Sequence, residues 1–186
     1  MKIYIATHNA HKLREMGEIL PGFEIAAEDP DAEETKETFE GNALIKVRAI
    51  AALHRGCWCM ADDSGLEVDA LGGAPGVRSA RYAGEPSNTP ANNALLLKNL
   101  EGVENRTARF VCAIALVDPE GREHVVRGEC PGRISTAASG TAGFGYDPLF
   151  VPDGHDQSFA DLGDVEKNKI SHRGRALAAV KAIMLK

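Results

Sequence analysis

The sequence lacks the features of a membrane or exported protein. None of its 186 residues belongs to an apolar run long enough to span a bilayer. The apolar stretch Met1–Ile5 is too short for a signal peptide, and polar Thr7 and His8 follow it. We therefore expect a cytoplasmic protein with no membrane partner.

An excess of positive charge is also missing. The chain carries 21 Lys and Arg against 27 Asp and Glu, a formal net charge of −6 at pH 7. Proteins that bind nucleic acid normally present a basic face, so we expect no nucleic-acid partner. A phosphorylated metabolite remains compatible with this charge, provided that a metal ion and a few lysines gather in one place.

Cysteine pairs with metal-binding or redox spacing are absent as well. Cys57, Cys59, Cys112 and Cys130 fit no usual zinc pattern, and Cys57-Trp58-Cys59 is not a Cys-x-x-Cys motif. We expect buried, reduced thiols. The sequence shows no internal repeat, linker or low-complexity segment, and its length suits one domain over residues 1–186.

Apolar patterning predicts an α/β fold. Strands are expected at 2–6, 23–27, 57–61, 107–117 and 124–130, and helices from Ala10, from Thr35 or Thr38, from Thr89 and after Ser171. Strands and helices alternate in the first part of the chain, and a long hairpin lies in the middle. This order favours a mixed sheet with flanking helices.

An acidic pair follows the apolar strand predicted at 57–61. Asp62 and Asp63 could supply the carboxylate oxygens that Mg²⁺ prefers, at a strand end where α/β folds place ligands. Because side chains alternate along an extended chain, only one of the two is expected to face a site. A polar turn that closes the strand explains the same residues equally well.

The turn between the first strand and the first helix is a candidate anion site. Thr7-His8-Asn9-Ala10-His11-Lys12 places backbone amides and one ammonium group at the start of a helix. It lacks the Walker pattern. His8 and His11 could be imagined as metal ligands, but two histidines without further ligands are more often ordinary surface residues.

Two segments near the C-terminus could hold a nucleoside. In Gly143-Phe144-Gly145-Tyr146-Asp147-Pro148 the glycines permit close backbone approach, and the aromatic rings offer faces for a flat base. A tight turn with core aromatics is the simpler explanation. Lys167 and Ser171-His172-Arg173 could face a phosphate or a base carbonyl, although a solvated helix start has the same composition.

Together these motifs resemble one family, the inosine triphosphate pyrophosphatases, also called dITP/XTP pyrophosphatases. The resemblance runs from Ala6 to Leu177. Its longest part is the segment from Ala61 through Leu71-Gly72-Gly73-Ala74-Pro75-Gly76 to Tyr82, and the segments 143–148 and 170–174 are also similar to the family. One departure is His8, where the family often has Gly.

The resemblance implies a role for each candidate residue. Asp63 would be the general base, and Asp63 and Glu34 would bind Mg²⁺. Residues that would contact the substrate are Thr7, His8, Asn9, Ala10, His11 and Lys12 at the triphosphate, and Ser64, Phe144, Gly145, Tyr146, Asp147, Lys167, His172 and Arg173 elsewhere. Arg173, beside His172, would donate to the carbonyl at the six position of the base.

The resemblance also implies the fold and the reaction. The fold would be an elongated α/β domain with a central mixed sheet and two lobes around an active-site cleft, and the protein would be a homodimer. Water would attack the α-phosphorus of a non-standard purine triphosphate such as ITP, dITP or XTP, with release of pyrophosphate.

Two other functions remain open at this point. A phosphatase or nuclease could use the acidic pair differently, although an aspartyl-phosphate enzyme needs Asp-x-Asp, and Asp62-Asp63 has no spacer. A nucleotide-binding module without turnover is the second alternative, which the intact acidic pair and Lys12 disfavour. The nature of the released product separates these alternatives.

Overall fold

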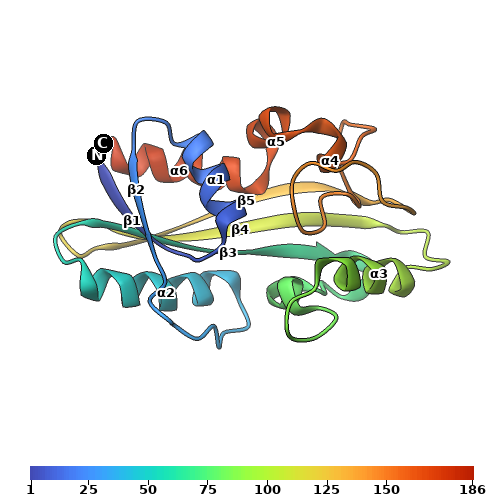
Figure 1. The fold of residues 1–186 in the computed structure, drawn as a ribbon, viewed down its shortest axis with the longest axis horizontal. Coiled ribbons are helices and arrows are strands. Elements are labelled where there is room, and N and C mark those ends of the chain that lie inside the picture. The colour runs from blue at the N-terminus through green and yellow to red at the C-terminus, as the bar shows by residue number, and fades with distance from the viewer. The chain divides into compact units, whose positions relative to one another are not determined.

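The computed structural model describes residues 1–186. Its strands are β1 (Lys2–Ala6), β2 (Glu24–Glu28), β3 (Trp58–Val68), β4 (Thr107–Val117), β5 (Glu123–Ile134) and β6 (Phe150–Pro152). Its helices are α1 (Ala10–Ile19), α2 (Phe39–Leu53), α3 (Thr89–Asn99), α4 (Phe159–Leu162), α5 (Asp164–Ile170) and α6 (His172–Met184), with 3₁₀ turns at Asp69–Leu71 and Gly76–Arg81. The elements are labelled in Figure 1.

The strands form one mixed sheet in the order β2-β1-β3-β4-β5-β6. Strand β1 pairs in parallel with both β2 and β3, whereas β5 and β6 are antiparallel. This sheet with flanking helices confirms the predicted α/β class.

Most predicted elements are present, with shifted ends. Strand β4 has the predicted bounds, β5 continues beyond Cys130 to Ile134, and β3 continues through the acidic pair to Val68. Of the two proposed caps for α2, Thr38 is the one used, because its side chain accepts a hydrogen bond from Gly41 N. Strand β6 and helices α4 and α5 were not predicted; at three to seven residues they are too short to show a clear periodicity.

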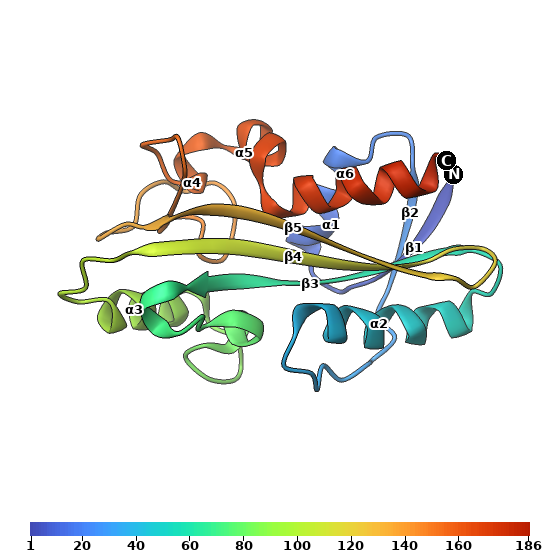
Figure 2. The ribbon, with the colours of Figure 1, turned by 180° about the vertical axis from the view of Figure 1, so that it is seen from behind.

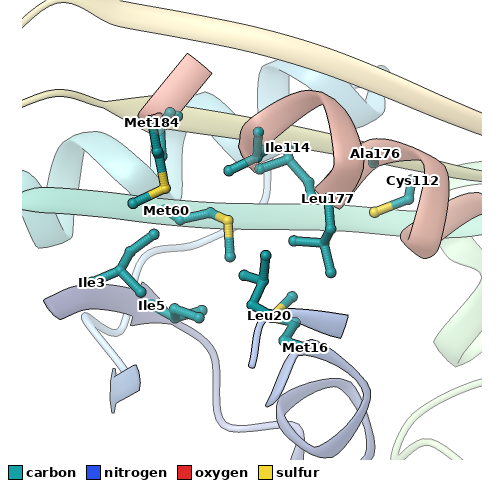
Figure 3. Close-up of a cluster of buried hydrophobic side chains, with 12 residues drawn as sticks. Ile3, Ile5, Met16, Leu20, Met60, Cys112, Ile114, Ala176, Leu177 and Met184 are labelled. Carbon is teal, nitrogen blue, oxygen red and sulfur yellow. The ribbon is translucent and has the colours of Figure 1, made fainter. Parts of the chain in front are cut away.

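The chain divides into two compact units. The first comprises 1–63, 112–128 and 172–186, and the second comprises 64–111 and 129–171. Within the first unit, α1 and α6 cover one face of the strands and α2 covers the other (Figures 1 and 2). Figure 3 shows the core on the α1 and α6 side, where Ile3, Met16, Met60 and Leu177 meet. On the α2 face, Ala43, Val47 and Ile50 pack on small residues such as Cys59 and Ala61.

The second unit has its own core. Within it, α3 lies on one face of the strands, and α4 and α5 lie on the other (Figures 1 and 2). Three aromatic rings form the centre: Phe110 lies 4.6 Å from Phe150 and 5.8 Å from Phe159, measured between ring centroids. Leu66 of β3 and Leu96 of α3 belong to the same cluster.

No helix is both long enough and apolar enough to cross a membrane. All four cysteines are free thiols, as expected. Cys59, Cys112 and Cys130 are buried, and Cys57 is partly exposed. Burial raises the pKa of the Cys59 thiol to about 11, which keeps it protonated at neutral pH.

A glycine in β5 sets how closely α6 approaches the sheet. A β-carbon at Gly128 would lie 2.2 Å from the backbone oxygen of His172 and 2.6 Å from the backbone nitrogen of Ala176. Both atoms belong to backbone, so the clash cannot be relieved by a side-chain rotation. Gly128 therefore fixes the first turn of α6, which carries His172 and Arg173.

We predict that Gly128→Ala lowers the free energy of unfolding by about 2 kcal/mol or more, since α6 must move away from β5. Gly17→Ala is the matched control, because a β-carbon there meets nothing within 4 Å. In helix α1 this control should gain about 0.5–1 kcal/mol. Urea unfolding followed by circular dichroism measures both changes, and equal effects of the two substitutions would contradict the proposed contact.

Candidate active site

The two adjacent aspartates lie inside strand β3 and not beyond its end. The expectation that Asp62 and Asp63 follow the strand is therefore wrong, because β3 continues from Trp58 to Val68. The expected alternation is confirmed by their partners. Asp62 faces α1 and α6, where it meets Lys12 and Arg173, whereas Asp63 faces α2, where it meets Asn42. The strand thus delivers one carboxylate to each of its faces.

Asp62 is a buried carboxylate surrounded by cations. Its Oδ2 forms ion pairs with Lys12 Nζ over 2.9 Å and with Arg173 Nη2 over 3.5 Å, and neither Oδ1 nor Oδ2 has a partner with hydrogen-bond geometry. Lys46 Nζ donates to the backbone oxygen of Asp62. Burial raises the pKa of Asp62, but Lys12, Arg173 and Lys46 together hold it well below its usual range. Asp62 is therefore ionised at neutral pH.

Arg173 is occupied by carboxylates of its own unit. Its side chain is 1% exposed, and its Nη1 donates to Oε1 of Glu15 over 2.8 Å, while Nη2 lies near Asp62. Glu15 is also 1% exposed. Two carboxylates and two cations, Lys12 and Arg173, thus balance one another, and of the four only Lys12 has appreciable solvent exposure, at 15%.

Asp63 has the opposite electrostatic environment. Its Oδ2 accepts a hydrogen bond from Asn42 Nδ2 over 3.0 Å. Burial and then the negative charge of Glu34 raise the pKa of Asp63 to about 7, against the lowering effects of Asn42, Lys46 and Lys12. Glu34 Oε1 in turn lies 3.2 Å from Lys46 Nζ. A carboxylate whose pKa lies near neutral pH can accept a proton and release it again.

The turn at residues 7–12 is built by Asn9. Its Oδ1 accepts hydrogen bonds from the amides of His11 and Lys12, so the residue caps α1 and part of the amide array is already satisfied. His8 Nδ1 lies 3.1 Å from Oδ2 of exposed Asp29. The backbone of His8 is not left-handed, since Asp31 is the only non-glycine residue with a positive φ. Histidine therefore fits at position 8 without strain.

In the second unit, Asp147 organises the glycine-rich segment. Its Oδ2 accepts hydrogen bonds from Phe144 N over 3.0 Å and from Lys167 Nζ over 2.7 Å. Lys167 Nζ also lies 4.7 Å from the centroid of the Phe144 ring. A β-carbon at Gly143, where φ is +74°, would lie 2.1 Å from Asp147 Oδ2. Glycine is required there so that Asp147 can hold Phe144 and Lys167 together.

Other predicted residues have mainly structural neighbours. Tyr146 belongs to the core of the second unit, and its hydroxyl donates to Ser79 O over 2.6 Å. Gly145, at φ +60°, accepts a hydrogen bond from Asn93 through its carbonyl oxygen. Ser64 is half-buried in β3, and His172 is buried at the start of α6. For these residues a contact with substrate stays a prediction.

Three polar residues of the site were missed by sequence reasoning: Glu15, Asn42 and Lys46. Asn42 and Lys46 are one turn apart in α2, so they share a face. Their polar side chains beside apolar Ala43 and Val47 were the available signal. Glu15 lies one turn after Lys12 in α1, and in the sequence alone it cannot be distinguished from an ordinary surface charge.

The two carboxylates should have opposite effects on stability. The pKa of Asp63 is higher in the folded protein than the ordinary value of 3.8. The contribution of Asp63 to the free energy of unfolding therefore falls as the pH rises from about 4 through 7. We predict that Asp63→Asn is more stable than the wild type at pH 8 in metal-free buffer, and that this gain disappears at pH 4. Urea midpoints at the two pH values measure it.

Asp62→Asn is the matched control, with the same change one residue away. It removes the carboxylate partner of Lys12 and of buried Arg173 and should lower the free energy of unfolding by about 3–5 kcal/mol at pH 8. A loss of stability in both variants at pH 8 would refute the contrast between the two faces of β3.

Comparisons with known proteins cover nearly the whole chain. The profile of the Ham1 family matches residues 3–183. A dITP/XTP pyrophosphatase of Desulforamulus reducens is 49% identical over 99% of this chain and 96% of its own length. A dITP/XTP pyrophosphatase from an Exiguobacterium species is 51% identical over 98% of this chain and 96% of its own length.

Solved structures of similar fold and sequence lead to the same family. The Ham1 protein of Staphylococcus aureus is 38% identical and has a TM-score of 0.87. The match covers 99% of this chain and 98% of that protein. The nucleoside-triphosphatase/dITP/XTP pyrophosphatase of Mycobacterium abscessus is 48% identical with a TM-score of 0.77, over 97% of this chain and 98% of its own. With sequence and fold matching from end to end, this chain belongs to the Ham1 family.

Proposed function

We propose that this protein hydrolyses non-standard purine nucleoside triphosphates, such as ITP, dITP and XTP, to the monophosphate and pyrophosphate. The observation that carries the proposal is the arrangement on β3, where Asp63 has a pKa near 7 while Asp62 gathers Lys12 and Arg173. A proton acceptor and a source of positive charge thus occupy neighbouring positions. The relatives named dITP/XTP pyrophosphatase support the substrate class.

Asp63 is the proposed general base. Water attacks the α-phosphorus, Asp63 accepts a proton from it, and pyrophosphate leaves. The elevated pKa of Asp63 suits this role, since a base works best when its pKa lies near the operating pH. Lys12 and the backbone amides of His8 and Ala10 would stabilise negative charge on the phosphates, whereas those of Thr7 and Asn9 already donate to other protein oxygens. Asp62 contributes by holding Lys12 in place.

Mg²⁺ is the proposed cofactor, with Glu34 and Asp63 as its protein ligands. The structure assembles no group of three or more His, Cys, Asp or Glu side chains that could enclose a metal ion. Two carboxylates nevertheless fit Mg²⁺, which usually keeps several waters and takes its other ligands from substrate phosphates. When bound, the ion would neutralise phosphate charge.

The nucleoside is proposed to contact the segment 144–147, with Phe144 as the stacking ring and Lys167 as a donor. The Asp147 interactions with Phe144 N and Lys167 keep these groups in fixed positions. We propose further contacts from Ser64, His172 and Arg173, as the family resemblance implies.

We further propose that residues 1–186 act as one domain and that the protein is a homodimer. The match to the Ham1 family profile over residues 3–183 supports the first point. Light scattering that gives only a monomer of 19.9 kDa would refute the second. The cytoplasmic location and the lack of a nucleic-acid partner stay predictions from composition.

A panel of nucleoside triphosphates with Mg²⁺ tests the function directly, with pyrophosphate and phosphate measured separately. We expect pyrophosphate, and higher kcat/KM for ITP, dITP and XTP than for ATP and GTP. Release of free phosphate would favour a phosphatase, and binding of nucleotide without turnover would favour a binding module.

We predict that Asp63→Asn lowers kcat by about 10²–10⁴-fold, because the base is lost while the shape of the side chain is kept. Steady-state pyrophosphate release measures it. Asp153→Asn, at an exposed aspartate of the second unit, is the control and should retain wild-type kcat. If Asp63→Asn keeps more than roughly a tenth of the wild-type turnover, the base is a residue other than Asp63.

Arg173→Ala tests selectivity. Arginine has only donors, so it favours a carbonyl at the six position of the base over the amino group of adenine. We predict that the variant loses about 10–150-fold in kcat/KM for ITP and much less for ATP. The control is Arg175→Ala, an exposed arginine of the same helix. Equal losses on both substrates would assign Arg173 to the Glu15 and Asp62 cluster alone.

A further inference from the structure

Asn42 uses every polar group of its buried side-chain amide. Its Oδ1 accepts a hydrogen bond from Lys36 N over 2.8 Å, and its Nδ2 donates to Lys36 O over 3.2 Å and to Asp63 Oδ2 over 3.0 Å. The contact with Lys36 N fixes which end of the amide carries oxygen, because only oxygen can accept from that donor. The orientation of the amide toward Asp63 is therefore determined.

The same side chain joins two parts of the candidate metal site. Lys36 is two residues beyond Glu34 in the segment that leads into α2, whereas Asp63 lies on β3. Lys46 makes a second connection, since it pairs with Glu34 and donates to the backbone oxygen of Asp62. Asn42 and Lys46 thus fasten the segment of Glu34 to β3 at two points.

From this geometry we infer that Asn42 is a positioning residue, which sets the separation of Glu34 and Asp63 so that both reach one divalent cation. The inference rests on the proposed roles of these two carboxylates. Two like charges repel each other, so they need an external constraint to remain close before a cation arrives. Asn42 provides this constraint without adding charge of its own.

Asn92 in α3 is a natural comparison. It is also buried in the first turns of its helix, accepts a hydrogen bond from Ala83 N over 2.7 Å and donates to Ala80 O over 3.0 Å. Like Asn42, it fastens the segment before its helix. It has no carboxylate partner among these contacts, so its removal reproduces the structural loss alone.

The experiment is a double-substitution cycle with Asn42→Ala, Glu34→Gln and their combination, with Asn92→Ala as the matched control. The dissociation constant of Mn²⁺ is measured by electron paramagnetic resonance without nucleotide. The Mg²⁺ half-saturation, kcat and nucleotide KM at saturating Mg²⁺ are measured in parallel. Urea unfolding compares the stability of the two asparagine variants.

We expect Asn42→Ala and Glu34→Gln each to raise the Mn²⁺ dissociation constant roughly tenfold, as for loss of one hydrogen bond to a charged group. The Mn²⁺ dissociation constant of the combined variant should exceed that of either single variant by no more than about twofold, because a displaced Glu34 no longer contributes to binding. Nucleotide KM should stay near the wild-type value. Asn92→Ala should lose comparable stability and leave Mn²⁺ binding unchanged.

Several outcomes would overturn the inference. Additive effects in the cycle would mean that Asn42 does not act through Glu34, and unchanged Mn²⁺ binding in Asn42→Ala would mean that it does not act on the metal site. Equal weakening by Asn92→Ala would reduce Asn42 to a stability role. An unchanged dissociation constant in Glu34→Gln would instead refute the proposed metal ligand itself. If Asn42→Ala does not fold, Asn42→Ser is held to the same criteria.

Discussion

The burial of one negative charge in strand β3 is the constraint on which the first unit depends. Asp62 is completely buried, and such a carboxylate is tolerated only when cations and hydrogen bonds replace water. Lys12 from α1 and Arg173 from α6 provide this replacement, and Glu15 balances Arg173. Both helices are therefore fixed against the strand by electrostatics as well as by the apolar core around Met16, Met60 and Leu177.

Neighbouring positions on one strand carry carboxylates with opposite properties. The alternation of side chains sends Asp62 toward cations and Asp63 toward α2 and Glu34, so the pKa of the first is lowered and that of the second is raised. Pairs of titratable groups whose pKa values are driven apart are typical of acid–base sites. Because the pKa of Asp63 is raised in the folded protein, ionisation of this carboxylate lowers the free energy of unfolding at neutral pH.

In the second unit, one aspartate compensates a buried positive charge. Asp147 binds Phe144 N and Lys167 Nζ through the same oxygen, and Gly143 leaves the space that this contact needs. The charge of Lys167 is thereby compensated while its ammonium stays against the ring of Phe144. Asp147 thus joins Phe144, in a loop that has no regular secondary structure, to Lys167 of helix α5.

The sequence by itself determined the α/β class, the bounds of β4, the opposite directions of Asp62 and Asp63, and the family, because periodicity and motifs are local properties of the chain. It could not give the partners of the buried charges. Glu15 and Arg173 are 158 positions apart and Asn42 and Asp63 are 21 apart, and no spacing rule connects residues on separate elements. Only the packing of α1, α2 and α6 on β3 decided which charges meet, since burial makes their pairing compulsory.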